Sequence, residues 1–162
     1  MSDREVLTWA EFGPATRMLA EQVVADGYRP ELLLCIARGG LLAAGALSYA
    51  LDVKNVHLMN VEFYTGVDQR LAAPVLLPPV PQTVHLSGAR VLVVDDVADT
   101  GATLTVAREH CVDAAQLRFA VLYEKPHSQV RCEYVWRRTD TWIDFPWSSQ
   151  PPVVPEPRVL DA

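Results

Sequence analysis

The run from Arg90 to Leu104, Arg-Val-Leu-Val-Val-Asp-Asp-Val-Ala-Asp-Thr-Gly-Ala-Thr-Leu, holds the side chains best suited to chemistry. Its first residues are β-branched and apolar, which predicts a buried strand that leads directly into Asp95 and Asp96. A polar loop, residues 99–103, comes next, and a helical pattern follows it. Because ligands of open parallel sheets bind beyond the carboxyl ends of the strands, we expect a ligand site at this loop.

The loop has the composition of an anion cradle. Its backbone N–H groups, the hydroxyls of Thr100 and Thr103, and the N-terminus of the following helix all favour a bound phosphate. Gly101 allows the backbone to close around that phosphate. Asp95 and Asp96 would repel it, so we expect them to face sugar hydroxyls or a divalent cation. A phosphate cradle beside such a pair describes a site for a phosphorylated sugar.

This run closely resembles the phosphoribosyl-pyrophosphate motif of the type I phosphoribosyltransferases. Ile36–Gly40 resembles the pyrophosphate loop of that family, and Tyr64–Arg70 resembles the start of its flexible catalytic loop. Glu124–Pro126 and Asp140–Trp147 resemble the purine-binding parts of the bacterial xanthine-guanine branch. The resemblance therefore covers nearly the whole chain, and the order of its motifs selects the branch that uses 6-oxopurines.

The resemblance implies a reaction and its participants. Ribose 5-phosphate would pass from phosphoribosyl pyrophosphate to a ring nitrogen of xanthine, guanine or hypoxanthine, and pyrophosphate would leave. The donor carries several negative charges, so Mg²⁺ is the expected cofactor. The expected partners are the donor, the purine base and further copies of the chain, as a homo-oligomer.

The resemblance also implies roles for residues on the donor side. Pyrophosphate would be held by Arg38, Gly39 and Gly40. The ribose hydroxyls would be held by Asp95 and Asp96, and Asp96 would also reach Mg²⁺. The 5-phosphate would be held by Thr100, Gly101, Ala102 and Thr103.

A second set of residues is implied for the base and for catalysis. Asp99 would contact purine N7 and act as general acid or base. Lys125 would donate to the 6-oxygen, Trp142 would stack on the ring, and the Ile143 carbonyl would accept from a 2-amino group. Arg70 would close over pyrophosphate with the catalytic loop. The four histidines show no ligand spacing, and we assign them no chemistry.

The elements that must position these residues alternate between apolar runs and helical patterns. Helices are expected from the Thr8–Glu11 capping box to about Asp26, over Leu41–Leu51, and from Thr103 to about Val112. Strands are expected at Leu32–Ile36, Val56–Val61, Arg90–Val94, Leu117–Tyr123 and Glu133–Trp136. This alternation predicts an α/β fold with a mostly parallel twisted sheet and helices on both faces. The resemblance adds a small C-terminal hood and a mobile loop.

The length of 162 residues fits a single domain, expected over residues 1–149. Thr65–Gly88 is rich in proline and lacks a helical period, so we expect a flexible loop there. Residues 150–162 form a proline-rich stretch, expected as an extended tail.

Composition excludes several classes of protein. The net charge of −6 argues against non-specific nucleic-acid binding. The longest apolar run is too short to span a bilayer, and the first residues lack the apolar segment of a secretory signal, so the cytoplasm is the expected location. Three scattered cysteines exclude a disulfide framework and a cysteine zinc site.

Two other functions remain open at this point. One is a phosphoribosyltransferase for a different base. The other is a regulator that keeps the phosphoribosyl-pyrophosphate site as a sensor. A regulator that acts on nucleic acid needs a basic surface or an added domain, and this acidic chain has no length to spare.

Overall fold

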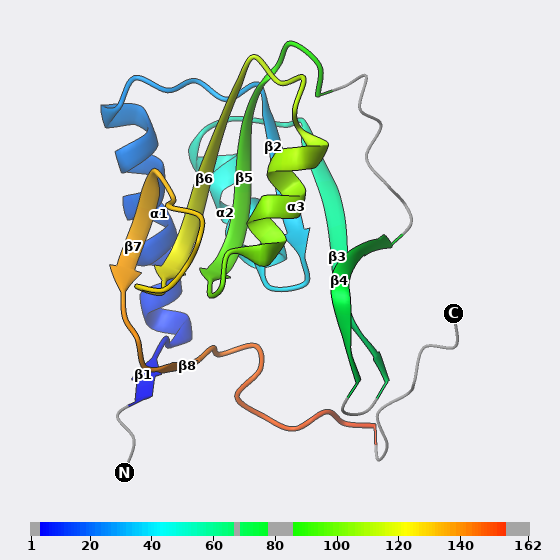
Figure 1. Cartoon of the computed structure of the whole chain (residues 1–162). Coiled ribbons are helices and arrows are strands. Elements are labelled where there is room, and N and C mark those ends of the chain that lie inside the picture. Colours follow the sequence, from blue (N-terminus) through cyan, green and yellow to red (C-terminus); the bar gives the residue numbers. More distant parts are fainter. Residues whose placement is uncertain (1–3, 67–68, 78–85, 155–162) are drawn as a thin grey trace.

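A six-stranded sheet with helices on both faces forms the body of the protein (Figure 1). The computed structural model describes residues 4–66, 69–77 and 86–154. The helices are α1 (Trp9–Ala25), α2 (Gly40–Ala50) and α3 (Ala102–His110). The strands are β1 (Arg4–Val6), β2 (Leu32–Ala37), β3 (Val56–Gly66), β4 (Gln69–Leu77), β5 (Arg90–Ala98), β6 (Gln116–Glu124), β7 (Tyr134–Arg138) and β8 (Trp142–Asp144). The expected fold class is confirmed.

The strand order in the sheet is β4-β3-β2-β5-β6-β7, and every pair is parallel except β3 with β4. Leu33 of β2 lies opposite Leu92 of β5, and Val94 of β5 lies opposite Ala120 of β6. The carboxyl ends of β2, β5 and β6 therefore meet at one edge. The loops that the sequence analysis singled out leave the sheet at this edge.

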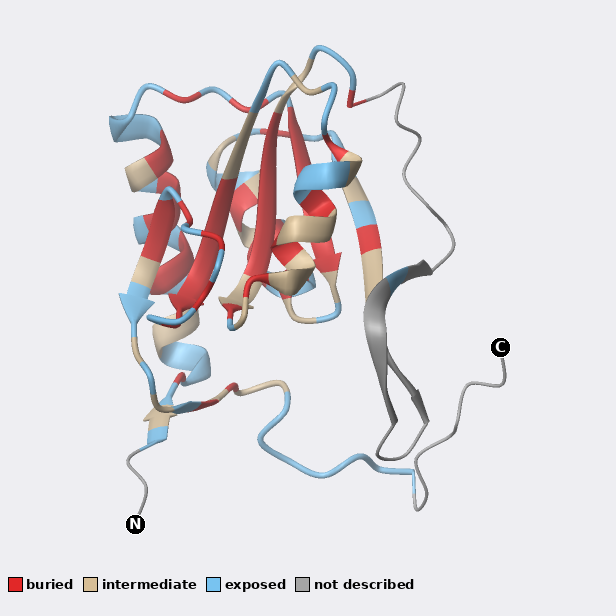
Figure 2. Cartoon of the chain, in the orientation of Figure 1, coloured by how far each residue is buried: buried red, intermediate tan, exposed pale blue. Residues whose placement is uncertain are grey.

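Side chains of the central strands alternate between two hydrophobic layers. Leu33 and Val94 pack toward α1 and α2, whereas Leu34 and Val93 pack toward α3. In Figure 1, α3 lies in front of the sheet and α2 behind it. Figure 2 shows that buried residues concentrate on these strands and on the inward faces of the helices. Burial on both faces explains why β2 and β5 read as continuous apolar runs.

Local signals set the first helix. Thr8 is the N-cap of α1: its hydroxyl accepts from the Glu11 backbone N–H at 3.2 Å, and a Glu11 carboxylate oxygen accepts from the Thr8 backbone N–H at 3.1 Å. This is the expected capping box. Gly27 follows the helix with a φ of 71°, a conformation that glycine adopts without strain.

The expectation of an irregular loop over Thr65–Gly88 was wrong for part of that segment. Strand β3 continues to Gly66, and β4 pairs with it in antiparallel fashion from Asn60–Leu77 to Gly66–Gln69. The prolines of this segment argued against a strand. However, β4 is an edge strand, and it tolerates Pro74 because one side of an edge strand needs no hydrogen-bond partner. Residues 67–68 and 78–85 lie outside the described residues.

A second, two-stranded sheet was not expected. Strands β1 and β8 pair in parallel, with Arg4 opposite Trp142 and Val6 opposite Asp144. Strands of three residues are too short to leave a periodic pattern, so the sequence does not signal them. Within the described part of the chain, the helices are all too short or too polar to cross a membrane.

Candidate active site

Two adjacent carboxylates near the end of β5 form the centre of the site. Asp95 is buried, with 7% of its surface exposed, and its Oδ1 accepts from the Asp96 backbone N–H at 2.9 Å. Burial raises the pKa of Asp95 well above its usual range, and the charge of Asp96 raises it further; burial also raises the pKa of Asp96. The two carboxylates are therefore more stable with a bound proton, a cation or a hydroxyl donor than as two ionised groups without a partner.

The loop after β5 turns at Gly101, which is the N-cap of α3 and has a φ of 84°. Glycine has no side chain to cap the helix, so the first turn of α3 depends on another acceptor for its N–H groups. An anion at this position would supply that acceptor and would gain from the helix dipole. Thr100 adds a hydroxyl, whose oxygen accepts from the Ala102 N–H at 3.3 Å.

A cavity of about 350 Å³ joins the acids to this loop. Its lining comes from the ends of β2 and β5, from Val61 in the middle of β3, from the loops after β2 and β5 and from the start of α3. The residues of the sequence-predicted site that line it are Gly39, Asp95, Asp96, Asp99, Thr100, Gly101, Ala102 and Thr103. The cavity has room for a phosphorylated sugar between the acid pair and the helix N-terminus.

The loop after β2 lies against the acids. A Cβ atom on Gly39 would overlap the Asp96 carboxylate, and a Cβ atom on Gly40 would overlap the Val94 carbonyl oxygen. Glycine is therefore required for this close approach of the loop to β5. The Ala37–Arg38 peptide bond is cis. Arg38 is exposed, and it is not among the residues that line the cavity.

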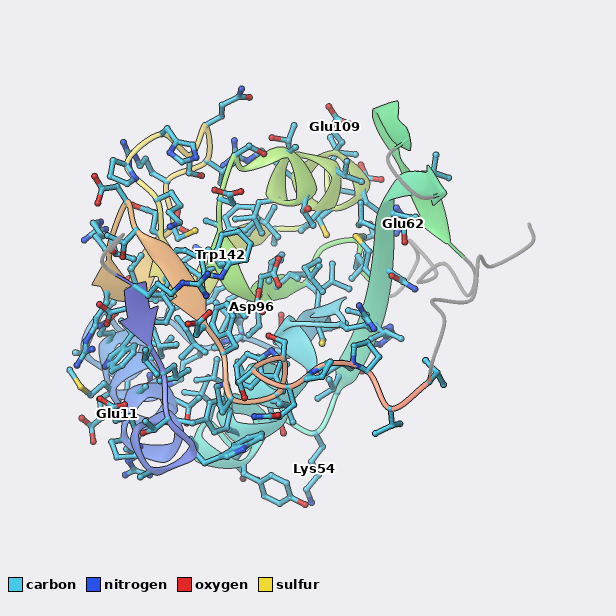
Figure 3. All side chains as sticks on the ribbon, turned by 90° about the horizontal axis from the view of Figure 1, so that it is seen from below. Glu11, Lys54, Glu62, Asp96, Glu109 and Trp142 are labelled. Atoms are coloured by element: carbon cyan, nitrogen blue, oxygen red, sulfur yellow. The ribbon has the colours of Figure 1, made fainter. Side chains whose placement is uncertain are left out.

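Lys125, Trp142 and Ile143 lie outside the lining of this cavity. Lys125 is 8% exposed, and its ammonium group donates to the carbonyl oxygen of Thr141, the residue before Trp142. Trp142 is 68% exposed and Ile143 is buried. Figure 3 looks onto this side of the molecule from below, where Asp96 and Trp142 are labelled. The fold thus brings Lys125 to the start of β8, and it leaves Trp142 largely exposed.

Arg70 stands in β4, and its backbone pairs with Tyr64 of β3. The side chains of both residues lie outside the described part of the structure. The implied position of Arg70 over pyrophosphate remains a prediction.

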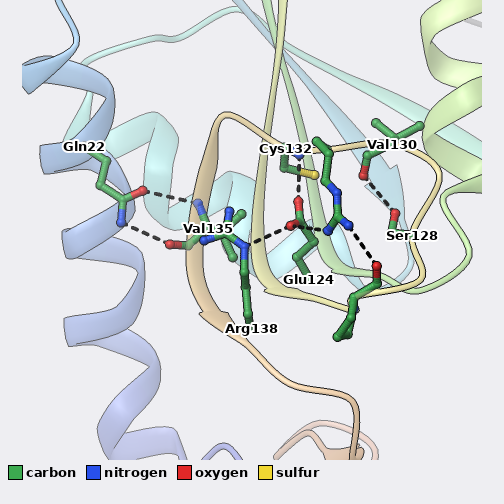
Figure 4. Close-up of polar contacts among 9 residues, drawn as sticks. Gln22, Glu124, Ser128, Val130, Cys132, Val135 and Arg138 are labelled. Atoms are coloured by element: carbon green, nitrogen blue, oxygen red, sulfur yellow. Dashed lines mark hydrogen bonds and ion pairs between the residues drawn. The ribbon is translucent and has the colours of Figure 1, made fainter.

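Sequence reasoning missed Glu124, which the structure shows as the anchor of the loop after β6 (Figure 4). Its side chain has no exposed surface and accepts from the Cys132 backbone N–H at 2.7 Å, from Arg131 at 3.1 Å and from Arg138 at 3.0 Å. Burial alone would raise the pKa of Glu124, but these hydrogen bonds outweigh it and lower the pKa. Arg131 also donates to the Pro126 carbonyl oxygen at 2.8 Å, which holds the loop after β6 in place.

His127 is a second residue that sequence reasoning missed. Its Nε2 atom lies 3.1 Å from Oδ1 of Asp99, 28 positions earlier in the chain. A single histidine between a proline and a serine carries no local signal of such a partner. Only the docking of two loops brings the pair together.

The residues present fit a magnesium ion. The described residues hold no group of three or more His, Cys, Asp or Glu side chains that would enclose a metal by themselves. Magnesium does not need one, because it commonly binds one or two carboxylates together with waters and substrate phosphates. Asp95, which is buried, and Asp96, which is partly buried, supply oxygen ligands at a position where added positive charge is favoured.

Comparisons with known proteins agree with this geometry. The family model described as phosphoribosyl transferase domain matches residues 3–155. The xanthine-guanine phosphoribosyltransferase of Idiomarina loihiensis is 34% identical over 150 residues, which cover 90% of this chain and 88% of that protein. The enzyme of the same name from Nitratidesulfovibrio vulgaris is 31% identical over 147 residues, covering 89% and 84% of the two chains. The crystal structure of the purine phosphoribosyltransferase from Pyrococcus horikoshii matches with a TM-score of 0.80 and 36% identity, over 94% of this chain and 99% of that one.

Proposed function

The chain belongs to the phosphoribosyl transferase domain family, and from this premise we propose that it is a purine salvage enzyme. It transfers ribose 5-phosphate from phosphoribosyl pyrophosphate to a 6-oxopurine: xanthine, guanine or hypoxanthine. The observation that carries the proposal is the cavity that joins buried Asp95 and its neighbour Asp96 to the N-terminus of α3, where the chain turns at Gly101. The names of its relatives support a purine as the acceptor.

Three groups of residues at the carboxyl ends of the strands bind the donor. The 5-phosphate lies at the residue 100–103 loop, where it accepts from the first N–H groups of α3. Asp95 and Asp96 accept hydrogen bonds from the ribose hydroxyls, and Asp96 is the expected ligand of Mg²⁺. The Gly39–Gly40 backbone and Arg38 bind pyrophosphate. When bound, Mg²⁺ supplies positive charge that stabilises the leaving pyrophosphate.

The base enters beside Asp99. The C1′–O bond to pyrophosphate breaks as a purine nitrogen forms its bond to C1′, and Asp99 accepts the proton that the purine loses. Positive charge develops on the ribose in the transition state, and the carboxylates of Asp95 and Asp96 stabilise it. Lys125 donates to the 6-oxygen, Trp142 stacks on the ring, and the Ile143 carbonyl accepts from a 2-amino group. Arg70 closes over pyrophosphate from the β3–β4 side.

One assay tests the proposal. Purified protein is incubated with Mg²⁺, phosphoribosyl pyrophosphate and, in turn, xanthine, guanine, hypoxanthine, adenine and orotate, while monophosphate formation is followed. We expect product with one or more of the 6-oxopurines, little with adenine, and none after chelation of Mg²⁺. Product with adenine or orotate alone would identify an enzyme for another base. Donor binding without transfer to any base would identify a sensor.

Two features of the whole chain complete the proposal. All three cysteines are buried thiols, which supports a reducing compartment such as the cytoplasm. Leu41, Leu42 and Tyr49 are exposed on α2, which supports contact with a second copy of the chain. Light scattering of the purified protein measures its mass: a mass of two or more chains supports the homo-oligomer, and the mass of one chain contradicts it.

A further inference from the structure

The turn after β6 lies against the loop after β5 at three successive points. The Lys125 N–H donates to the Ala98 carbonyl oxygen at 2.9 Å, and the Gln129 N–H donates to the Thr100 carbonyl oxygen at 2.9 Å. Midway between these bonds, His127 meets Asp99, which lies midway between Ala98 and Thr100. The two backbone bonds therefore fix the positions of both residues relative to each other.

The turn itself is held in shape. The Ser128 N–H donates to the Lys125 carbonyl oxygen at 3.1 Å, which closes a turn with Pro126 and His127 at its centre. Arg131, anchored on buried Glu124, donates to the Pro126 carbonyl oxygen. The side chain of His127 is therefore presented from a constrained backbone, although 59% of its surface is exposed.

The direction of the hydrogen bond follows from the acceptor. An ionised carboxylate can only accept, so the Nε2 atom of His127 carries the proton and donates to Oδ1 of Asp99. This holds for the neutral ring and for the cation. The bond occupies one carboxylate oxygen and leaves the other, Oδ2, for the purine.

We propose that His127 is a positioning residue that orients Asp99 for proton transfer at purine N7, an inference that rests on the proposed function. Atoms O6 and N7 are neighbours on the purine edge, and the turn that carries Lys125 also carries His127. One short turn would then contact this edge twice: directly through Lys125, and through the His127–Asp99 pair. Misplacement of a reacting group by about 1 Å costs on the order of a hundredfold in rate, so loss of this bond is expected to be visible in kcat.

Three variants test the proposal by steady-state kinetics with the best purine of the wild-type enzyme. His127→Ala should lower kcat about tenfold or more, with the KM for phosphoribosyl pyrophosphate unchanged. His127→Gln, which keeps an N–H donor, should stay within about threefold of the wild type. His57→Ala serves as the matched control: His57 bonds to Asn55 at 2.9 Å, but it stands at the opposite end of the strands and should leave kcat unchanged.

A double mutant separates positioning from a merely structural role. If His127 acts through Asp99, then His127→Ala should cost no further activity in an Asp99→Asn background. An equal loss in both backgrounds would show that His127 only holds the turn, and it would overturn the proposal. Equal activity of His127→Ala and wild type, or a His127→Gln enzyme as slow as His127→Ala, would also overturn it.

A measurement without turnover keeps this inference distinct from the proposed function. The ¹⁵N resonance of His127 Nε2 should shift when Asp99 becomes Asn, because the bond loses its charged acceptor. A wild-type protein that makes no nucleotide would overturn the proposed function, and the positioning role of His127 with it. If the wild type is active but its His127 resonance is the same as in Asp99→Asn, only the inference about His127 is overturned.

Discussion

Gly39 lies so close to Asp96 that the loop after β2 cannot carry a side chain at this position without displacing the carboxylate. Gly39 lies in the loop after β2 and Asp96 lies in strand β5, yet both residues line the cavity. This close approach also affects the burial of the two acids. The backbone of the loop after β2 covers part of the acid pair, in which Asp95 is buried and Asp96 is partly buried, and this burial raises the pKa of both.

The first prediction concerns the stability of the acid pair. Because the folded protein raises the pKa of Asp95 and Asp96, it favours their protonated forms, and their ionisation at neutral pH opposes folding. Asp95→Asn with Asp96→Asn should therefore raise the Tm of the ligand-depleted protein at pH 7–8. The advantage should shrink as the pH falls toward the unfolded pKa of 3.8, because below it both states bind the protons.

The same double variant should lose function. Its Mg²⁺-dependent affinity for phosphoribosyl pyrophosphate, measured by calorimetry, should fall sharply. A folded variant with wild-type donor affinity would remove the acids from the donor site. A variant with a lower Tm at neutral pH would contradict the argument from burial.

The second prediction concerns Gly101. Alanine there would hold a φ of 84° and place its Cβ 2.8 Å from the Val130 backbone nitrogen and 2.9 Å from the Ser128 hydroxyl. We expect Gly101→Ala to lower the free energy of unfolding by at least about 1–2 kcal/mol, measured by urea denaturation. Gly45→Ala is the matched control, because its Cβ meets nothing within 4 Å inside α2. It should stabilise the protein by about 0.5–1 kcal/mol, and equal effects of the two changes would refute the reasoning.

The third prediction concerns Glu124. The folded state lowers its pKa, so its charged form stabilises the protein above the unfolded pKa near 4.5, and this contribution is lost as the pH falls through the folded pKa. Glu124→Gln should be less stable than wild type at pH 7 by about 1–2 kcal/mol, a modest figure because Arg131 and Arg138 are largely exposed. The difference should disappear well below pH 4. A difference that is constant over this range would mean that the charge of Glu124 plays no part.

The fourth prediction separates the two base-binding residues. Lys125→Ala should weaken use of 6-oxopurines most and narrow the gap to adenine, because it removes the donor that an adenine amino group cannot satisfy. Trp142→Ala should raise the KM of every accepted base by a similar factor, equivalent to roughly 1–3 kcal/mol. Steady-state kinetics with guanine and adenine measures both effects.

Trp9→Ala is the control for the tryptophan. Trp9 is 58% exposed, comparable to Trp142, but it packs on Phe12 and Trp147. The Trp9→Ala change should leave the KM values for the bases unchanged. An unchanged ratio of guanine to adenine use in Lys125→Ala would mean that Lys125 does not read the base.

Much of the site could be predicted from the sequence because its residues are close together in the chain. The strand into Asp95 and Asp96, the turn at Gly101 and the start of α3 are consecutive, and each is specified by residues within a few positions. The apolar runs of β2 and β5 likewise specify strands buried on both faces. β4 was missed because Pro74 argues against a strand unless the strand is known to lie at an edge, and the strand order is not a local property.

By itself, the sequence determined the strand–acid–loop–helix unit, the α/β class and the family. The tertiary structure alone decided which distant segments touch: Gly39 against Asp96 of β5, Lys125 against the Thr141 carbonyl, and His127 against Asp99. The physical reason is sheet register. Strands β5 and β6 pair in parallel with Ala98 opposite Glu124, and this register sets where the loops that follow the two strands begin. Contacts between those loops therefore depend on residues far from either one.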